Sequence, residues 1–179
     1  FVREVAKWLG IRCLVTRLKK TSRPSEAFLR EARYAALASM AKRARCSRIA
    51  VAHTADDQAE TILLRIVRGT GLSGLSGMAR ERRMGRRWIV RPLLSVGRED
   101  LRDYLKRHGV GFRVDRSNRD LSYARNRVRL RVLPELRKIN PRVREAVLRL
   151  SSLSSAEPAW TSRGKALSKA HVDALRRMV

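Results

Sequence analysis

Apolar and polar residues along this 179-residue chain follow helical and strand-like periods in turn. Apolar positions at helical spacing predict helices over residues 2–9, 26–45, 54–67 and 98–108. Short apolar or alternating runs predict strands over 11–18, 49–52, 88–90 and 110–114, and 80–87 looks like an Arg-rich connector. Short apolar strands between helices are typical of a parallel sheet covered by helices. The pattern therefore predicts an α/β fold, with a Rossmann-like parallel sheet and flanking helices.

The chain beyond residue 115 is predicted to be helical. One helix ends at Asn140-Pro141, and a second runs to about Leu150. The segment 151–162 is rich in serine and is typical of a linker, and Ser168 could cap a last helix. We therefore expect one domain over 1–150, followed over 151–179 by a linker and the beginning of another domain.

Net charge narrows the class of partner. Forty-two Lys and Arg against 16 Asp and Glu give +26, although 44% of residues are hydrophobic, as in a globular protein. Such a charge predicts a polyanionic partner, with nucleic acid first and an anionic membrane surface second. The alternative is that a genome rich in G and C places Arg on solvated faces. No run approaches ~18 apolar residues, so no membrane span is expected.

Cysteine content excludes some chemistry. Cys13 and Cys46 are the two cysteines of the chain, and they are far apart in sequence. No Cys-x-x-Cys pair is present for zinc or an iron–sulfur cluster, and reduced thiols of a cytoplasmic protein are the expectation.

The segment around residue 57 carries the candidate chemistry. His53 is predicted to end a strand, at the edge where open α/β sheets bind ligands. Thr54 and Asp57 have the spacing of a helix cap, which explains Asp57 without any function. Glu60 lies three residues after Asp57, one turn further along the predicted helix, and Thr61 follows it. Paired carboxylates near a His could hold magnesium, bind an ammonium group or deprotonate an amine.

Glycine and arginine mark three further candidate regions. Gly69 suits a helix end, and the following glycines of 71–77 suggest backbone held close to a ligand. Arg30 and Arg33 share a helix face, either as a solvated edge or as a phosphate or carboxylate contact. The segment 115–131 carries six arginines, which indicate a basic loop entering a helix or a clamp on phosphate groups.

Together these segments resemble the tRNA(Ile)-lysidine synthetases, members of the N-type ATP pyrophosphatase (PP-loop) group. The resemblance covers residues 1 to about 150 and rests on several segments in order. They are Arg30-Glu-Ala-Arg33-Tyr34, the run from His53 to Thr61, the run from Arg68 to Met78, Arg91-Pro-Leu-Leu94, Asp115-Arg-Ser-Asn118, Tyr123-Ala-Arg-Asn126 and Leu133-Pro134.

The resemblance implies an activity and its substrates. ATP would adenylate the wobble cytidine of a tRNA(Ile) with a CAU anticodon, and free L-lysine would then displace AMP to form lysidine. ATP and Mg2+ are the implied cofactors, the cytoplasm is the implied compartment, and a homodimer is left open. The fold is then that of the adenine nucleotide alpha hydrolases. The resemblance also implies that residues 1–150 are a partial N-terminal catalytic domain. Residues 151–179 would then be the linker and the start of a C-terminal tRNA-binding domain.

The resemblance also implies roles for individual residues. The implied catalytic residues are His53, Asp57, Glu60, Arg33 and Arg125, with Asp57 and Glu60 also as metal ligands. The implied nucleotide-binding residues are Gly69, Thr70, Gly71 and Arg33. The implied substrate and tRNA contacts are Asp56, Thr61, Arg91, Asn118, Asn126, Arg127 and Arg129.

One element of the family pattern is missing. The Ser-Gly-Gly-x-Asp-Ser loop that grips pyrophosphate does not occur in the chain. We therefore expect an N-terminally truncated chain that lacks its first strands. Two alternatives are a tRNA thiolase of the same group, which the lack of cysteine pairs disfavours, and a non-catalytic RNA-binding module. A pure binder of polyanions would gain nothing from the grouped acids Asp56, Asp57 and Glu60.

Overall fold

A computed structural model of the protein describes residues 1–18 and 25–154. Its sheet consists of β1 (Arg48–Ala50), β2 (Glu81–Met84) and β3 (Arg87–Val90) in the order β1-β3-β2. β1 runs parallel to β3, and β2 runs antiparallel to β3. The predicted α/β architecture and its parallel strand pair are confirmed. The antiparallel strand β2 shows that the prediction of an Arg-rich connector over 80–87 was wrong.

The β2–β3 hairpin forms because its turn has the right chemistry. Met84 pairs with Arg87, which leaves Gly85 and Arg86 as a two-residue turn. Gly85 has a φ of 59°, in the left-handed region that glycine enters without a steric penalty. Arginines on both faces of β2 hide the alternation of apolar and polar residues by which strands are recognised.

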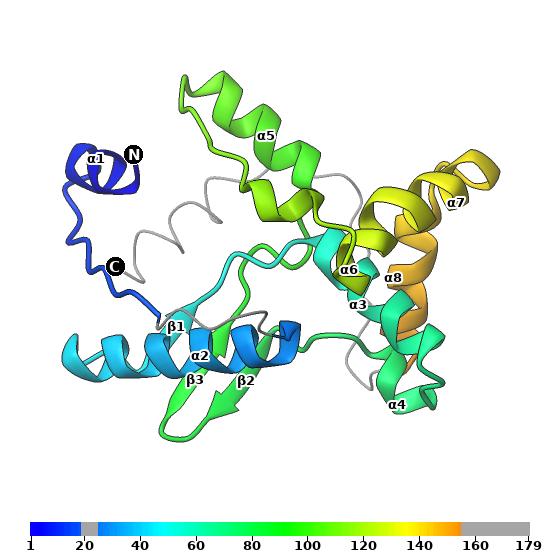
Figure 1. Cartoon of the computed structure of the whole chain (residues 1–179), viewed down its shortest axis with the longest axis horizontal. Coiled ribbons are helices and arrows are strands. Elements are labelled where there is room, and N and C mark those ends of the chain that lie inside the picture. The colour runs from blue at the N-terminus through cyan, green and yellow to red at the C-terminus, as the bar shows by residue number, and fades with distance from the viewer. Residues whose placement is uncertain (19–24, 155–179) are drawn as a thin grey trace.

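The helices surround the sheet and extend to one side of it (Figure 1). Helix α2 lies along the sheet, while α3, α4, α6, α7 and α8 gather at one end. In chain order the helical elements are α1 (Val2–Trp8), α2 (Glu26–Arg43), α3 (Ala55–Val67), α4 (Leu72–Leu75), α5 (Arg98–Arg107), the 3-10 turn η1 (Arg116–Arg119), α6 (Ala124–Arg127), the π-helical turn η2 (Val128–Val132), α7 (Leu133–Ile139) and α8 (Val143–Ser154).

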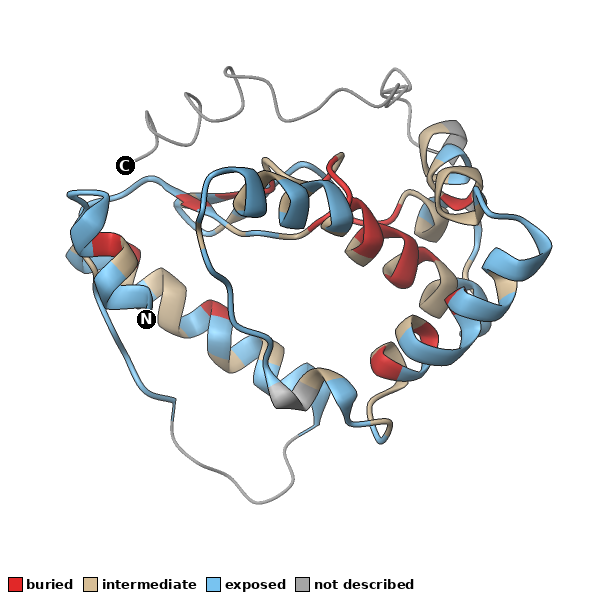
Figure 2. Ribbon diagram, turned by 90° about the horizontal axis from the view of Figure 1, so that it is seen from above, coloured by how far each residue is buried: buried red, intermediate tan, exposed pale blue. Residues whose placement is uncertain are grey.

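Helix α3 is the most buried helix of the described chain (Figure 2). Ala59 and Ile62 pack against Val147 of α8 and form the centre of the core. Ile66 and Val67 are exposed at the end of the helix. Glu60, although it carries a charge, has an exposure of 0%. An ionised side chain that is buried to this extent requires charged partners.

Two predicted strands are wrong. Residues 11–18 and 110–114 are extended but pair with no strand in the described part of the chain. An isolated extended segment gains no ladder hydrogen bonds, and apolar side chains such as Val15 and Val114 are more than half exposed. The alternation was a correct sign of extended backbone, but it could not show whether a neighbouring strand was present.

Two helix boundaries also differ from the prediction. Helix α2 ends at Arg43, two residues before the predicted end; its buried residues are Tyr34 and Ala41, and Phe28 is 47% exposed. Helix α8 continues to Ser154, four residues into the predicted linker. The rest of that linker and the predicted last helix lie outside the described residues. No helix in the described ranges combines the length and the apolar character that crossing a membrane requires.

Candidate active site

Two polar side chains follow the parallel strands at the same edge of the sheet. His53 comes just after β1 and Arg91 directly after β3, and backbone pairing continues past β1 from Val51 N–H to the Val90 carbonyl. Arg91 Nε donates to His53 Nδ1 over 3.3 Å, and its Nη1 donates to the Ala79 carbonyl over 2.6 Å. The carboxyl edge of the strands thus brings His53 and Arg91 together, as expected for open α/β sheets.

His53 is held in its neutral form. Burial lowers its pKa to about 4, and the charges of Arg91, Arg125 and Arg30 act in the same direction, while Asp57 opposes them. Because Nδ1 accepts the hydrogen bond from Arg91, the ring proton is on Nε2. Near neutral pH this side chain offers an N–H donor and is a poor proton acceptor.

The N-terminus of α3 is organised by a capping box. Thr54 Oγ1 accepts from the Asp57 backbone N–H, and Asp57 Oδ2 accepts from both the backbone N–H and the hydroxyl of Thr54. Burial alone would raise the pKa of Asp57. The hydrogen bonds from Thr54 and the charges of Arg125 and Arg98 outweigh burial and lower the pKa, so Asp57 is ionised at neutral pH.

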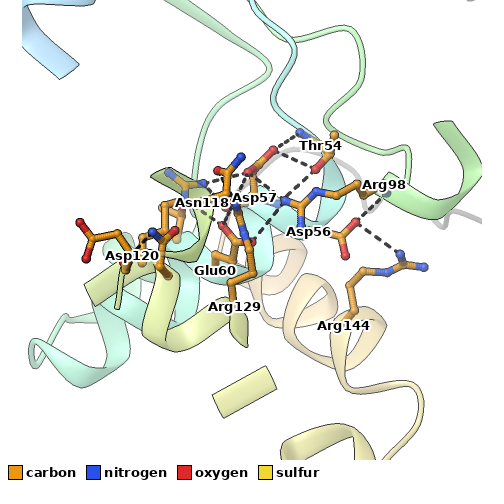
Figure 3. Close-up of polar contacts among 12 residues, drawn as sticks. Thr54, Asp56, Asp57, Glu60, Arg98, Asn118, Asp120, Arg129 and Arg144 are labelled. Carbon is orange, nitrogen blue, oxygen red and sulfur yellow. Dashed lines mark hydrogen bonds and ion pairs between the residues drawn. The ribbon is translucent and has the colours of Figure 1, made fainter. Parts of the chain in front are cut away.

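Three arginines from three elements converge on Glu60 and Asp57 (Figure 3). Arg129 Nε and Nη2 donate to the two oxygens of Glu60 over 2.7 and 2.9 Å, and Arg125 Nε donates over 2.8 Å. Arg98 Nη2 lies 3.3 Å from both carboxylates. Asp57 Oδ1 also accepts from Arg125 and Arg129 over 3.3 Å. We call Arg98, Arg125 and Arg129 the paired arginines.

Asp56 extends this arrangement to further helices. Its Oδ2 accepts from the Arg98 backbone N–H over 2.7 Å at the start of α5. Arg144 of α8 and Arg137 of α7 each approach Asp56 to 3.6 Å (Figure 3 labels Asp56 and Arg144). The three acids at the start of α3 therefore tie the Arg-rich C-terminal helices to the sheet.

A magnesium ion at Asp57 and Glu60, as predicted from the resemblance, does not fit this arrangement. Mg2+ requires carboxylate oxygens that are free to coordinate it, and these oxygens accept hydrogen bonds from three guanidinium groups. Within the described ranges, no group of three or more His, Cys, Asp or Glu side chains could hold a metal ion. We therefore assign no metal to these two residues.

A second group of arginines has no carboxylate partner. Tyr34 is surrounded by Arg30, Arg33 and Arg82, whose guanidinium carbons lie 5.2, 5.9 and 5.7 Å from the ring centroid. The hydroxyl of Tyr34 is buried and has no hydrogen-bond partner among the described residues. Arg91 is only 3% exposed, and like the other three it forms no salt bridge within the described chain. We call Arg30, Arg33, Arg82 and Arg91 the carboxylate-free arginines.

Electrostatics link this second group to the sheet edge. Burial lowers the pKa of Arg30; Tyr34 opposes that shift, and the charges of Arg33, Arg125 and Arg91 add to it. The guanidinium groups of Arg33, Arg91 and Arg125 thus lie close enough to Arg30 to repel it. Of these four arginines, only Arg125 has a carboxylate partner in the described chain. Such a site gains free energy when an anion enters it.

Other predicted residues are placed around the paired arginines. Asn118 Oδ1 accepts from Arg129 Nη1 over 3.1 Å. Asn126 is buried and donates to the Asp120 carbonyl over 2.8 Å. The Thr61 hydroxyl donates to the Asp57 carbonyl within α3, and Arg127 is exposed with Nη1 on the Leu121 carbonyl. Asn118 supports the cluster directly, whereas Thr61 and Arg127 point their polar groups elsewhere.

The predicted nucleotide-binding residues Gly69, Thr70 and Gly71 lie at the other end of α3. Helix α3 ends at Val67, and at 1.5 Å per residue this loop is about 18 Å from Asp57. Gly69 has a φ of 76°, which suits its predicted place after the helix. The structure does not bring these three residues together with His53 and Asp57, and their contact with a nucleotide stays a prediction.

The glycines at 74 and 77 approach the chain's own side chains. A Cβ on Gly77, whose φ is 67°, would lie 2.5 Å from Gln58 Nε2. Gln58 holds this segment through the Met78 backbone N–H at 2.7 Å and the Met78 carbonyl at 3.1 Å. Arg65 Nη1 donates to the carbonyls of Gly74 and Gly77 over 2.8 Å. This backbone was predicted to lie close to a ligand, and in the structure it lies close to the side chains of Gln58 and Arg65 of α3.

Sequence reasoning missed Arg98, Arg82 and Tyr34 as members of these clusters. Arg98 follows Gly97 at the first position of a predicted helix, where no local pattern indicates a partner 38 residues away. Arg82 was hidden by the connector prediction. Tyr34 stands beside Arg33 and four residues after Arg30, which was the available signal.

Comparisons with known proteins agree with this architecture. A family model described as a PP-loop domain matches residues 1–136. The chain is 45% identical over 120 residues to a tRNA(Ile)-lysidine synthase of Porphyromonas gingivalis, covering 67% of this chain and 26% of the relative. It is 42% identical over 134 residues to the enzyme of that name from Geobacter sulfurreducens, covering 75% and 28%.

A third relative and a solved structure extend the comparison. A tRNA(Ile)-lysidine synthase of Bacillus cereus is 35% identical over 166 residues, covering 89% of this chain and 35% of the relative. A U34-tRNA thiolase from Methanococcus maripaludis, solved with its [4Fe-4S] cluster, superposes with a TM-score of 0.66 at 14% identity, covering 93% of this chain and 59% of that one. That likeness shows the fold alone. The chain spans between about a quarter and about a third of the length of the curated relatives it matches.

The family match covers both parallel strands, the acidic start of α3 and the arginines of α6 and η2. The matches to two of these relatives cover 75% and 89% of the chain. This chain therefore belongs to the PP-loop domain family.

Proposed function

We propose that this chain provides part of the active site of a tRNA-modifying ligase, which uses ATP to adenylate the wobble cytidine of tRNA(Ile) and attaches lysine to form lysidine. The observation that carries the proposal is the set of carboxylate-free arginines beside His53 at the carboxyl edge of the parallel strands. The names and similarity of the relatives support the substrate assignment.

The reaction requires compensation of negative charge. In the first step the cytidine O2 attacks the α-phosphorus of ATP, and the bond to pyrophosphate breaks. In the second step the lysine ε-nitrogen forms a bond to C2, AMP leaves with the oxygen, and the nitrogen loses a proton. Fixed guanidinium groups such as Arg91 and Arg30 can stabilise the charge on phosphate oxygens in both steps.

His53 would act in this site as a hydrogen-bond donor. Its Nε2 carries the proton, and its pKa of about 4 keeps the ring neutral near pH 7. A neutral imidazole can donate to a phosphate or carbonyl oxygen without adding a charge. We therefore assign it to orienting the substrate rather than to removing the proton from the lysine amine.

Asp57 and Glu60 would position Arg125 and Arg129. Both carboxylates are ionically paired with these arginines, so each guanidinium is fixed in orientation and holds α6 and η2 against α3. A lysine ammonium could bind these carboxylates only by displacing a guanidinium group. The lysine-binding role implied by the resemblance thus stays a prediction, and it requires the paired arginines to move.

The test is an assay of the complete protein that contains this chain. We expect one equivalent of pyrophosphate to be released with ATP and tRNA(Ile) alone, and continued release over many turnovers only when lysine is also present, with lysidine in the recovered tRNA. Arg91→Gln should lower the rate at least tenfold, because a buried cation at the strand edge is lost. Lys138→Gln is the matched control, since that exposed cation pairs only with Glu135 in the described chain. Turnover without lysine, or full activity of Arg91→Gln, would contradict the proposal.

A non-catalytic RNA-binding module is the second candidate, and the high net charge favours it. The paired arginines supply a reason for the acids that does not require catalysis, namely anchoring α5, α6 and η2. Pyrophosphate release distinguishes the two candidates. A binding module would bind tRNA with an affinity that falls steeply with salt, but it would release no pyrophosphate. A sulfur-transfer reaction is disfavoured, because the two cysteines, Cys13 and Cys46, are far apart in sequence and form no Cys-x-x-Cys pair.

A further inference from the structure

One face of the sheet carries an exposed tryptophan between two arginines. Trp88 of β3 pairs with Arg48 of β1 on one side and with Arg83 of β2 on the other. Residues that are directly opposite in a sheet project from the same face. The three side chains therefore form one row across all three strands.

This row lies on the face of the sheet away from α2. Arg82 and Ile89 pair with each other, and Arg82 reaches the ring of Tyr34 in α2, so their shared face is the one that α2 covers. Ile49 and Ile89 on that covered face are buried, whereas Arg48 and Ala50 on either side of Ile49 are exposed. Trp88 belongs to the second face and is 41% exposed.

The charge around the row is strongly positive. The hairpin segment 80–87 holds five arginines and one acid, Glu81, and that acid pairs with Arg48 over 3.1 Å. Arg83 Nε donates to the Gly85 carbonyl over 3.2 Å, and Arg86 is exposed; neither forms a salt bridge with a described residue. No described ring or guanidinium group stacks on the indole of Trp88. An open aromatic face between cations matches a nucleobase that is flanked by phosphates.

We infer that this face, the Trp88 row, binds single-stranded RNA, with a base stacked on the Trp88 indole and phosphates held by Arg83 and Arg48. The row is about 10 Å along β3 from Arg91, so it is separate from the strand-edge cluster. The inference rests on the proposed function only for the choice of RNA as the polyanion. A second copy of the chain, or another segment covering this face, is the competing occupant.

Tryptophan fluorescence of the full 179-residue chain tests the inference. The chain has tryptophans at 8, 88 and 160, so Trp8→Phe with Trp160→Phe leaves Trp88 as the reporter. We expect a 12-nucleotide oligoadenylate to quench its emission, because stacking brings the base against the indole, and a heparin fragment of equal charge to bind without that quenching. Equal quenching by heparin, or an indole shielded from acrylamide before RNA is added, would overturn the inference.

Affinity measurements on variants give an independent readout. Trp88→Ala should weaken oligoadenylate binding about tenfold, and Trp88→Phe should retain most of the affinity. Arg83→Gln should reduce the slope of log affinity against log salt by about 0.7. Trp8→Ala removes another exposed tryptophan, on α1, and should change nothing. Wild-type affinity in a folded Trp88→Ala variant would refute stacking. If Trp88→Ala does not fold, the affinity of Trp88→Phe and the quenching of Trp88 fluorescence test the inference instead.

The result can be separated from the proposed function. Oligoadenylate binding requires neither ATP nor lysine, so it can succeed where lysidine formation fails. In the complete protein, Trp88→Ala should raise the KM for tRNA and leave kcat near the wild-type value. A loss confined to kcat would contradict a binding role for this face.

Discussion

The paired and the carboxylate-free arginines use the same side chain in opposite ways. The paired arginines surround Glu60, which is fully buried, and they satisfy its oxygens with hydrogen bonds of 2.7 to 3.3 Å. The carboxylate-free arginines gather around Tyr34 and His53 with no acid to neutralise them. The first group joins elements of the fold, whereas we propose that the second group binds an anionic ligand. A count of arginines cannot separate these roles, but the position of the carboxylates can.

The largest effect is expected from removing the acid at the centre of the paired group. Glu60→Ala would leave three partly buried guanidinium groups with a single remaining carboxylate, Asp57. Loss of one partner of a buried ion pair costs about 3–5 kcal/mol, and chemical unfolding should show a loss of this order. The control is Glu135→Ala, which removes an exposed pair with Lys138 and should cost less than about 0.5 kcal/mol. Similar losses in the two variants would remove the distinction between the groups.

Acid should weaken the protein through His53, which lies between the groups. Its folded pKa of about 4 is below the usual value near 6.5, so folding favours the neutral ring. This contribution is complete above pH 6.5 and is lost as the pH falls from 6.5 to 4, by up to about 3 kcal/mol.

The measurement is the free energy of unfolding from pH 7.5 to 4.5, at constant ionic strength. His53→Gln should flatten the curve between pH 6.5 and 4.5. Asp57, whose pKa is lowered, contributes stability above its unfolded pKa that is lost only at more acidic pH. An unchanged curve in His53→Gln would show that burial and the surrounding cations do not hold the ring neutral.

The smallest effect concerns the cap that fixes Asp57. Thr54→Ala removes a hydroxyl that donates to Asp57 Oδ2 and accepts from its backbone N–H. Loss of such a cap costs about 1 kcal/mol, measurable as a lower midpoint of thermal unfolding. Thr54→Ser retains the hydroxyl and should stay within a few tenths of wild type. If Thr54→Ala were neutral, the orientation of Asp57 would depend on the paired arginines alone.

The sequence predicted secondary-structure elements and local helix caps better than it predicted which distant segments pair or contact one another. The capping box of Thr54 and Asp57, the strands after which His53 and Arg91 follow, and the break at Asn140-Pro141 all depend on neighbouring residues, and the structure confirms them. The strands over 11–18 and 110–114 failed because pairing depends on distant chain segments.

Predictions of site residues also succeeded where they depended on neighbouring residues and failed where they depended on distant ones. Grouping Asp57 with Glu60 was correct because they are one helical turn apart, but their guanidinium partners lie 38 to 72 residues away. No spacing rule could therefore show that these carboxylates were already engaged. Gly69–Gly71 show that a short distance in sequence does not mean a short distance in space: they follow Asp57 closely along the chain, yet the length of α3 separates them from it.

The most direct test of this account compares Arg129→Gln with Arg30→Gln in two assays, the free energy of unfolding and the rise in melting temperature caused by pyrophosphate. Arg129→Gln should lose about 2–3 kcal/mol of stability, because its hydrogen bonds to Glu60 are charge-assisted, and should keep the pyrophosphate response. Arg30→Gln should keep its stability, since it relieves repulsion, and should lose at least half of the response. Equal behaviour of the two variants in both assays would contradict the division into structural and ligand-binding arginines.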